Sequence, residues 1–198
     1  MKFFIGLIIF SLSNLVIGSI EDYFPENRVT SSNYGNTGLL EIPSARFAQE
    51  GTLRFGISNS YPNTFTFLTA NPFPWLEATY RYTEIKNRLY GPYAFSGNQT
   101  YKDKGFDIKL LLAKESYVRP SIAIGLRDIA GTGIFSSEYL VASKEIKDFD
   151  VSIGIGWGRL GQLANISNPL TSWSKGFNFR NSNIGEGGTF NQKDWFSG

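Results

Sequence analysis

The sequence has no cysteine and no histidine among its 198 residues, and its one methionine is the first residue. Without cysteine the fold can contain no disulfide and must be held by strand pairing and packing alone. A lipidated N-terminal cysteine is likewise not expected. Without histidine the Ser-His and Cys-His catalytic pairs are excluded, as is the commonest zinc ligand. We therefore expect neither enzymatic activity nor a bound metal or cofactor.

The net charge of the chain is also small. The chain has 19 basic and 17 acidic side chains, a formal net charge of +2, and Lys2 lies in a segment that we expect to be removed. A nucleic-acid partner would require a basic stripe or patch. We therefore expect no nucleic-acid binding.

The N-terminus has the pattern of a secretory signal peptide. Lys2 precedes the mostly apolar run Phe3–Ile17, which ends beside the small residue Gly18. A transmembrane anchor is the alternative, but it needs about 20 apolar residues. This run is shorter and is interrupted by polar residues, which are Ser11, Ser13 and Asn14. The pattern predicts a signal peptide over residues 1–18 and an exported mature chain.

Aromatic residues and glycine are abundant, with 17 Phe, 10 Tyr, 4 Trp and 21 Gly. Beyond residue 18 the apolar residues alternate with polar or small ones, as Leu53, Phe55 and Ile57 do. Alternation with a period of two is typical of strands, whose successive side chains point to opposite faces. The sequence predicts strands at 51–59, 64–69, 75–84, 105–113, 120–128, 133–144 and 149–158.

These strands predict an all-β antiparallel meander that forms part of an outer-membrane β-barrel. Membrane-spanning strands have about 9–11 residues, and outer-membrane barrels keep their long loops on one side. The two long connections here, 86–104 and the segment after Arg159, open on the same side of the predicted sheet. Seven strands fall short of the usual even set, so the barrel is expected to be incomplete. A soluble secreted carbohydrate-binding β-sandwich also alternates and remains the alternative.

The predicted organisation has residues 19–50 leading into the barrel, 51–158 forming its strands, and 159–198 forming a truncated loop rich in glycine and asparagine. Charged side chains opposite the apolar faces would line the barrel interior: Arg54, Glu77, Arg81, Asp107, Lys109, Arg127 and Glu138. They could form ion pairs that steady the barrel, or offer donors and acceptors to a passing polar solute. A glycan hydrolase would need a carboxylate pair, and no spacing specifies one.

Several blocks, taken in order, resemble the YjbH family of bacterial envelope proteins: Gly38–Arg46 (GLLEIPSAR), Pro72–Ile85, Lys102–Ser116, Ser121–Lys144 and Gly154–Gly161. This resemblance implies a Gram-negative outer-membrane β-barrel associated with exopolysaccharide or capsule production and export. Its expected partners are outer-membrane lipid, a polysaccharide and other envelope export proteins. Many family members are lipoproteins, and they are much longer, so the chain is expected to be an N-terminal portion.

Overall fold

The computed structural model describes residues 29–161, 166–174 and 177. The predicted signal peptide and most of segment 159–198 lie outside the described residues. Within these residues the chain forms one large sheet in strand order β3-β4-β5-β6-β7-β8-β9, every neighbouring pair antiparallel. Its strands are β3 (Thr52–Ser60), β4 (Asn63–Phe73), β5 (Leu76–Leu89), β6 (Thr100–Ala113), β7 (Ser121–Ile129), β8 (Ser137–Ile146) and β9 (Phe149–Gly158).

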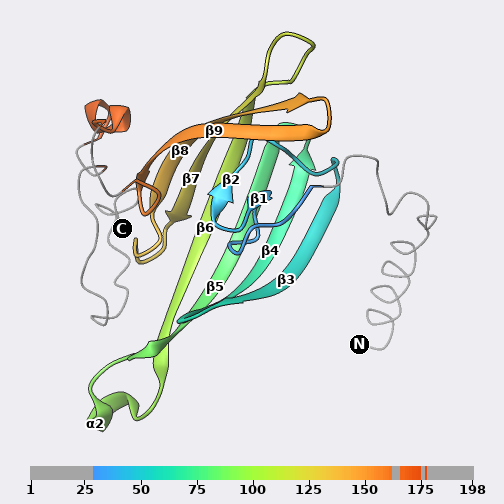
Figure 1. Cartoon of the computed structure of the whole chain (residues 1–198). Coiled ribbons are helices and arrows are strands. Elements are labelled where there is room, and N and C mark those ends of the chain that lie inside the picture. Colours follow the sequence, from blue (N-terminus) through green and yellow to red (C-terminus); the bar gives the residue numbers. More distant parts are fainter. Residues whose placement is uncertain (1–28, 162–165, 175–176, 178–198) are drawn as a thin grey trace, which may run out of the picture.

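The predicted antiparallel meander is confirmed, and the sheet curls into a half-barrel (Figure 1). The 64–69 segment is a real strand and is longer than predicted. Both ends of the predicted loop 86–104 are strand, because β5 and β6 extend as a projecting hairpin with the short helix α2 (Tyr93–Ser96) near its tip. This connection and the exit from β9 leave the sheet at the same end, which we call the loop end. The β4–β5, β6–β7 and β8–β9 connections lie at the opposite turn end.

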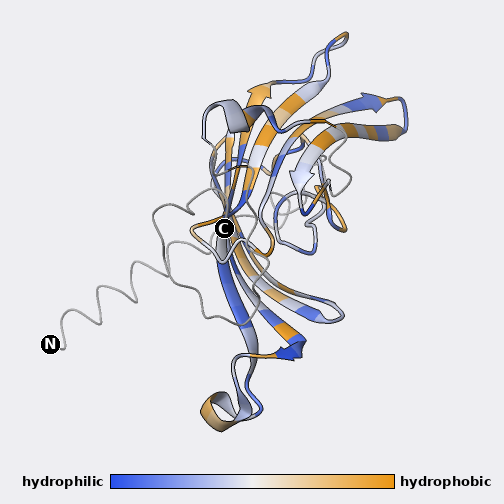
Figure 2. Ribbon diagram, turned by 90° about the vertical axis from the view of Figure 1, so that its left-hand side faces the viewer, coloured by the Kyte–Doolittle hydropathy of each residue, from blue (hydrophilic) through white to orange (hydrophobic). Residues whose placement is uncertain are grey.

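The outer, convex face of the sheet is apolar and exposed. Phe55, Leu68, Tyr80 and Phe106 lie directly opposite one another across four adjacent strands, and all are more than a third exposed. Hydrophilic and hydrophobic residues alternate along the strands in Figure 2. The same face carries further exposed apolar side chains, which are Leu53, Ile57, Ile108, Leu140, Val151, Ile153 and Ile155.

The inner, concave face has the opposite character. Between the exposed apolar positions lie buried polar side chains such as Thr69, Thr79 and Asp107, which face one another across β4, β5 and β6. Burial of charged groups is expected only where they are paired. The described sheet is therefore inside-out relative to a soluble β-sandwich, whose core is apolar.

The segment that precedes β3 covers the concave face. We call residues 29–50 the strap; it contains a small hairpin of β1 (Gly38–Leu39) and β2 (Ile42–Pro43). Figure 1 shows β1 and β2 in front of the middle of the sheet. The strap adds two apolar clusters to the polar interior. Tyr34 packs with Phe65, Ile85, Tyr101 and Phe135, and Ala45 packs with Ala123, Tyr139 and Val141.

The short 3-10 turn η2 (Pro169–Ser172) follows β9. Among the described residues, no helix is long and apolar enough to cross a membrane.

Candidate functional site

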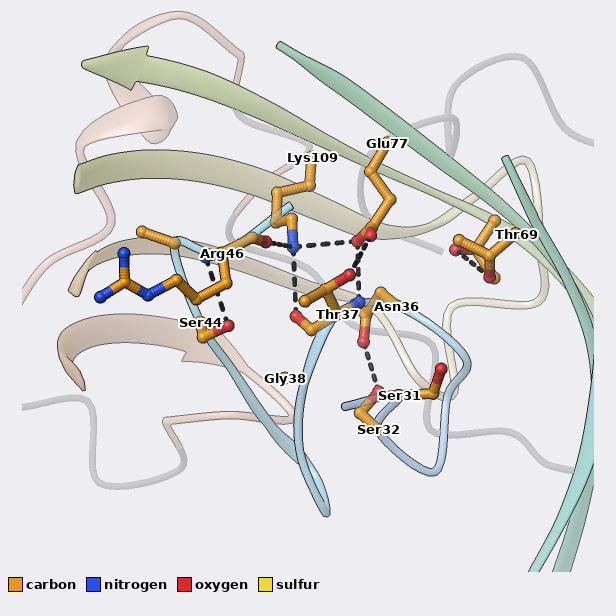
Figure 3. Close-up of polar contacts among 12 residues, drawn as sticks. Ser31, Ser32, Asn36, Thr37, Gly38, Ser44, Arg46, Thr69, Glu77 and Lys109 are labelled. Atoms are coloured by element: carbon orange, nitrogen blue, oxygen red, sulfur yellow. Dashed lines mark hydrogen bonds and ion pairs between the residues drawn. The ribbon is translucent and has the colours of Figure 1, made fainter. Parts of the chain in front are cut away.

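The candidate site is the polar wall beneath the strap (Figure 3). Strand β5 places Glu77 on the concave face directly opposite Lys109 of β6, and their charged atoms lie 2.9 Å apart. Both side chains are only 1% exposed. Arg54 of β3 reaches the same carboxylate at 2.9 Å. Three residues from the predicted set thus form one cluster. Glu77 and Lys109 are paired across adjacent strands, and the partly buried Arg54 side chain reaches past β4 to the same carboxylate.

Glu77 is held by the strap as well as by the sheet. The Thr37 backbone amide donates to Glu77 Oε1 at 2.9 Å, and the Thr37 hydroxyl donates to Oε2. Arg54 Nη2 donates both to that hydroxyl and to the carboxylate, each at 2.9 Å. A buried carboxylate with several donors is stabilised as an anion. Thr37 therefore completes the site from outside the sheet.

Lys109 has all three of its donor positions used. Besides Glu77, its ammonium group donates to the backbone carbonyls of Thr37 at 3.1 Å and Arg46 at 2.7 Å. It also lies 4.5 Å from the centre of the Phe47 ring, within range of a cation–π contact. The strap therefore satisfies a lysine that would otherwise be buried with too few acceptors.

A second cluster surrounds Arg81 nearer the loop end. Arg81 is fully buried and donates to both oxygens of Asp107, at 3.1 and 2.9 Å, and to Asp128 at 3.4 Å. Its guanidinium lies 5.1 Å from the ring centres of both Tyr34 and Phe135. Aromatic neighbours of this kind suit the planar, weakly hydrated guanidinium.

Arg127 of β7 is the least satisfied member of the set. It donates to the backbone carbonyl of Glu41 at 3.2 Å and lies over the rings of Tyr34 and Tyr139, at 4.5 and 5.6 Å. It is 3% exposed. Its Nε and Nη2 atoms have no hydrogen-bond partner among the described residues. Within the described part of the chain, two buried guanidinium nitrogens beneath the strap therefore have no acceptor.

Glu138 does not share this face. It lies opposite Leu126 and Trp157 on the convex side, where Asn168 donates to its carboxylate at 2.9 Å. The prediction grouped it with the interior set by taking Tyr139 and Val141 as lipid-facing. Those two side chains instead point to the concave face, because Ala45 of the strap packs against them.

Sequence reasoning missed the strap as part of the site. Tyr34 and Thr37 fall in a segment without alternation, and their contacts on the sheet are distant in sequence. Asp128 was also missed, although an acidic residue beside Arg127 at a predicted strand end was an available signal. Among the described residues, no group of three or more acidic, cysteine or histidine side chains could hold a metal ion.

The sequence of the chain matches a known protein family. Residues 30–198 match the family described as exopolysaccharide biosynthesis protein YbjH. The chain belongs to the YjbH family. It is 45% identical over 170 residues, 85% of its length, to the uncharacterized lipoprotein YjbH of Escherichia coli (strain K12). It spans only 24% of that relative, so this YjbH-family chain corresponds to about a quarter of it. No solved structure matches the chain.

Proposed function

We propose that this YjbH-family chain forms part of an outer-membrane β-barrel that serves exopolysaccharide or capsule export and assembly without catalysing a reaction. The observation that carries the proposal is the inside-out sheet. Its convex face exposes Phe55, Ile57 and Leu68, while Glu77 and Lys109 are buried on the concave face. An apolar exterior around a polar interior is the arrangement of membrane barrels.

The ends of the sheet support the same placement. Phe73 and Trp75 stack at the turn end with ring centres 5.4 Å apart, and Tyr117 is exposed at that end. Tyr61 and Phe95 are exposed at the loop end. Aromatic residues gather where a membrane barrel meets the two interfaces. The partners proposed from this geometry are lipid outside and a polysaccharide inside, and family membership supports the pathway.

The relative named a lipoprotein supports a place in the cell envelope for this chain. We propose the outer membrane because the exposed apolar band belongs to strands and not to a helix. Other envelope export proteins would contact the ends of the barrel. The open edges of β3 and β9, which have no further strand partner within the described residues, would pair with further strands to close it.

The test places an arginine at two positions of β3 that would lie at different depths in the membrane. It uses the longest natural form of the protein. Phe55→Arg lies mid-strand on the convex face, and Asn59→Arg lies on the same face near the loop end. An arginine facing lipid costs about 2–4 kcal/mol at the midplane and about 0–1 kcal/mol near an interface. We expect Phe55→Arg to reduce the heat-modifiable form in outer-membrane fractions and the secreted polysaccharide, with Asn59→Arg near wild type. Equal behaviour of the two variants, or recovery in soluble periplasm, would contradict the proposal.

A further inference from the structure

Apart from the ion pairs of Arg46 at its end, the strap contacts Glu77, Lys109 and Arg127 through neutral groups. Thr37 offers a hydroxyl and an amide to Glu77, and three strap carbonyls, those of Thr37, Glu41 and Arg46, accept from Lys109 and Arg127. Ser58 and Thr69 likewise donate to the backbone carbonyls of Asn33 and Gly35. Under the middle of the strap, the polar wall therefore binds hydroxyl, amide and carbonyl groups and not charged groups.

These are the functional groups of a neutral sugar chain that carries acetamido substituents. Glu77 requires donors, whereas Lys109 and Arg127 require acceptors, and a hydroxyl supplies both. A chain of carboxylates or sulfates would place like charge against Glu77. Tyr139 and Phe135 on the same face offer aromatic surfaces for the apolar faces of sugar rings.

The strap is attached in a way that allows it to leave. Its only strands, β1 and β2, pair with each other in a separate sheet, so in the described residues it shares no ladder with β3–β9. Both of its ends, Val29–Thr30 and Gln49–Glu50, line one groove of about 1020 Å³ at the turn end. The strap therefore enters and leaves through the same opening, and withdrawal would require no strand to break.

Unused donors point to a ligand other than the strap. Arg127 keeps Nε and Nη2 without partners although the residue is 97% removed from solvent, and the Asn36 Nδ2 of the strap is also unpartnered among the described residues. Buried donors without acceptors are unfavourable. The strap thus fits the wall incompletely, as an internal substitute would.

We propose that the concave wall of Arg54, Glu77, Lys109 and Arg127 is a binding site for a neutral, hydroxyl- and acetamido-bearing glycan chain, and that the strap occupies this site when the glycan is absent. This inference deepens the proposed role in exopolysaccharide export and rests on it. Glycan and strap compete for the same donors and acceptors, so the glycan binds only when the strap withdraws toward the turn end.

A removable tether tests the competition. The Ala45 backbone amide donates to Ser143 Oγ at 2.9 Å, so the two residues are in contact. The double variant Ala45→Cys/Ser143→Cys places one cysteine on the strap and one on β8, and the chain has no other cysteine. Oxidation locks the strap on the wall, and reduction frees it in the same molecule. Single Ala45→Cys, treated identically, is the matched control.

The readout is calorimetric binding of chitohexaose, a neutral acetamido-bearing oligosaccharide, and of a hexamer of galacturonic acid, to the longest natural form of the protein in detergent. Apparent affinity scales with the fraction of molecules whose site is free. We expect chitohexaose to bind at least about tenfold more tightly to the reduced than to the oxidised double variant. The single variant should show no such difference, and the acidic hexamer should bind weakly to both.

Equal chitohexaose affinity in the two redox states, binding to neither, or preference for the acidic hexamer would overturn the inference. Heat-modifiable migration of both redox states shows that the barrel is folded in each. Failure of the export proposal would instead appear as loss of outer-membrane fractionation or unchanged polysaccharide secretion. The two failures are therefore distinguishable.

Discussion

The strap is fastened to the sheet in two places that differ in their surroundings. At its centre Thr37 joins the buried Glu77–Lys109 pair, whose side chains are 1% exposed. At its end Arg46 lies between Glu115 and Asp150, whose side chains are 21% and 50% exposed. The number of charged contacts is similar, yet only the centre excludes water. We therefore expect the buried centre to determine the position of the strap, and the exposed end to add little.

The largest expected effect comes from breaking the buried pair. Lys109→Met leaves the Glu77 carboxylate buried without its ammonium partner and removes the donor to the Thr37 and Arg46 carbonyls. Removing one member of a buried pair costs about 3–5 kcal/mol. We expect a loss of this size in the free energy of unfolding, measured by denaturant titration in detergent micelles.

The matched control removes both charges. Lys109→Met/Glu77→Gln should recover part of the loss, because the buried carboxylate is gone and only the partly exposed Arg54 loses its acidic partner. A single variant that costs no more than the double variant would show that the pair is not a coupled unit in the folded protein.

A smaller loss of stability is expected from a substitution at Gly35, in the turn of the strap that precedes Thr37. Gly35 has a φ of 93°, and a Cβ there would lie 2.3 Å from Cγ of Phe67. Left-handed strain costs about 1–2 kcal/mol and overpacking about 1–3 kcal/mol, so we expect Gly35→Ala to lower the free energy of unfolding by about 2 kcal/mol or more.

Gly51 provides the control for this change. It has a φ of 80°, but a Cβ there meets no atom within 4 Å. Gly51→Ala should therefore cost only the backbone strain, about 1 kcal/mol. Equal losses at the two glycines would mean that Phe67 does not restrict the strap.

The exposed end should respond weakly. Arg46 donates to Asp150 through Nε at 2.9 Å and Nη2 at 2.6 Å, and to Glu115. Exposed ion pairs contribute about 0–1 kcal/mol and are screened by salt. We expect Arg46→Gln to lower the free energy of unfolding by no more than about 1 kcal/mol, with the difference shrinking at high salt. A loss as large as that of Lys109→Met would reverse the order of the two attachments.

The same contrast explains what the sequence could predict. Alternation is a local signal, so it located the strands and placed Arg54, Glu77 and Lys109 on one face. The strap's position depends on contacts far apart in sequence, such as Arg46 with Asp150, 104 residues away, and no local pattern encodes them.

The error at Glu138 has the same origin. Tyr139 and Val141 are apolar in either environment, and only the covering strap determines that they face inward. Because a period of two fixes which residues share a face but not which face is inside, assigning these two to the exterior moved Glu138 to the interior. The pairing of Arg81 with Asp107 was also beyond prediction, since it depends on the register between β5 and β6.

The stability that the exposed Arg46–Glu115 contact contributes should also depend on pH. Partial burial by itself would raise the pKa of Glu115, but hydrogen bonds from Lys144, Arg46 and the Glu145 backbone amide outweigh it and lower the pKa to about 2. A carboxylate whose pKa is depressed in the folded state adds stability above its ordinary pKa of 4.5 and loses it as pH falls toward 2.

Comparison with Glu115→Gln cancels the titration of other carboxylates. We expect the wild type's advantage over this variant to be constant above about pH 5 and to disappear by about pH 2, measured as the difference in free energy of unfolding. An advantage that persists unchanged at pH 2 would mean that ionisation of Glu115 does not contribute to holding the strap, and that Arg46 is retained there by Asp150 alone.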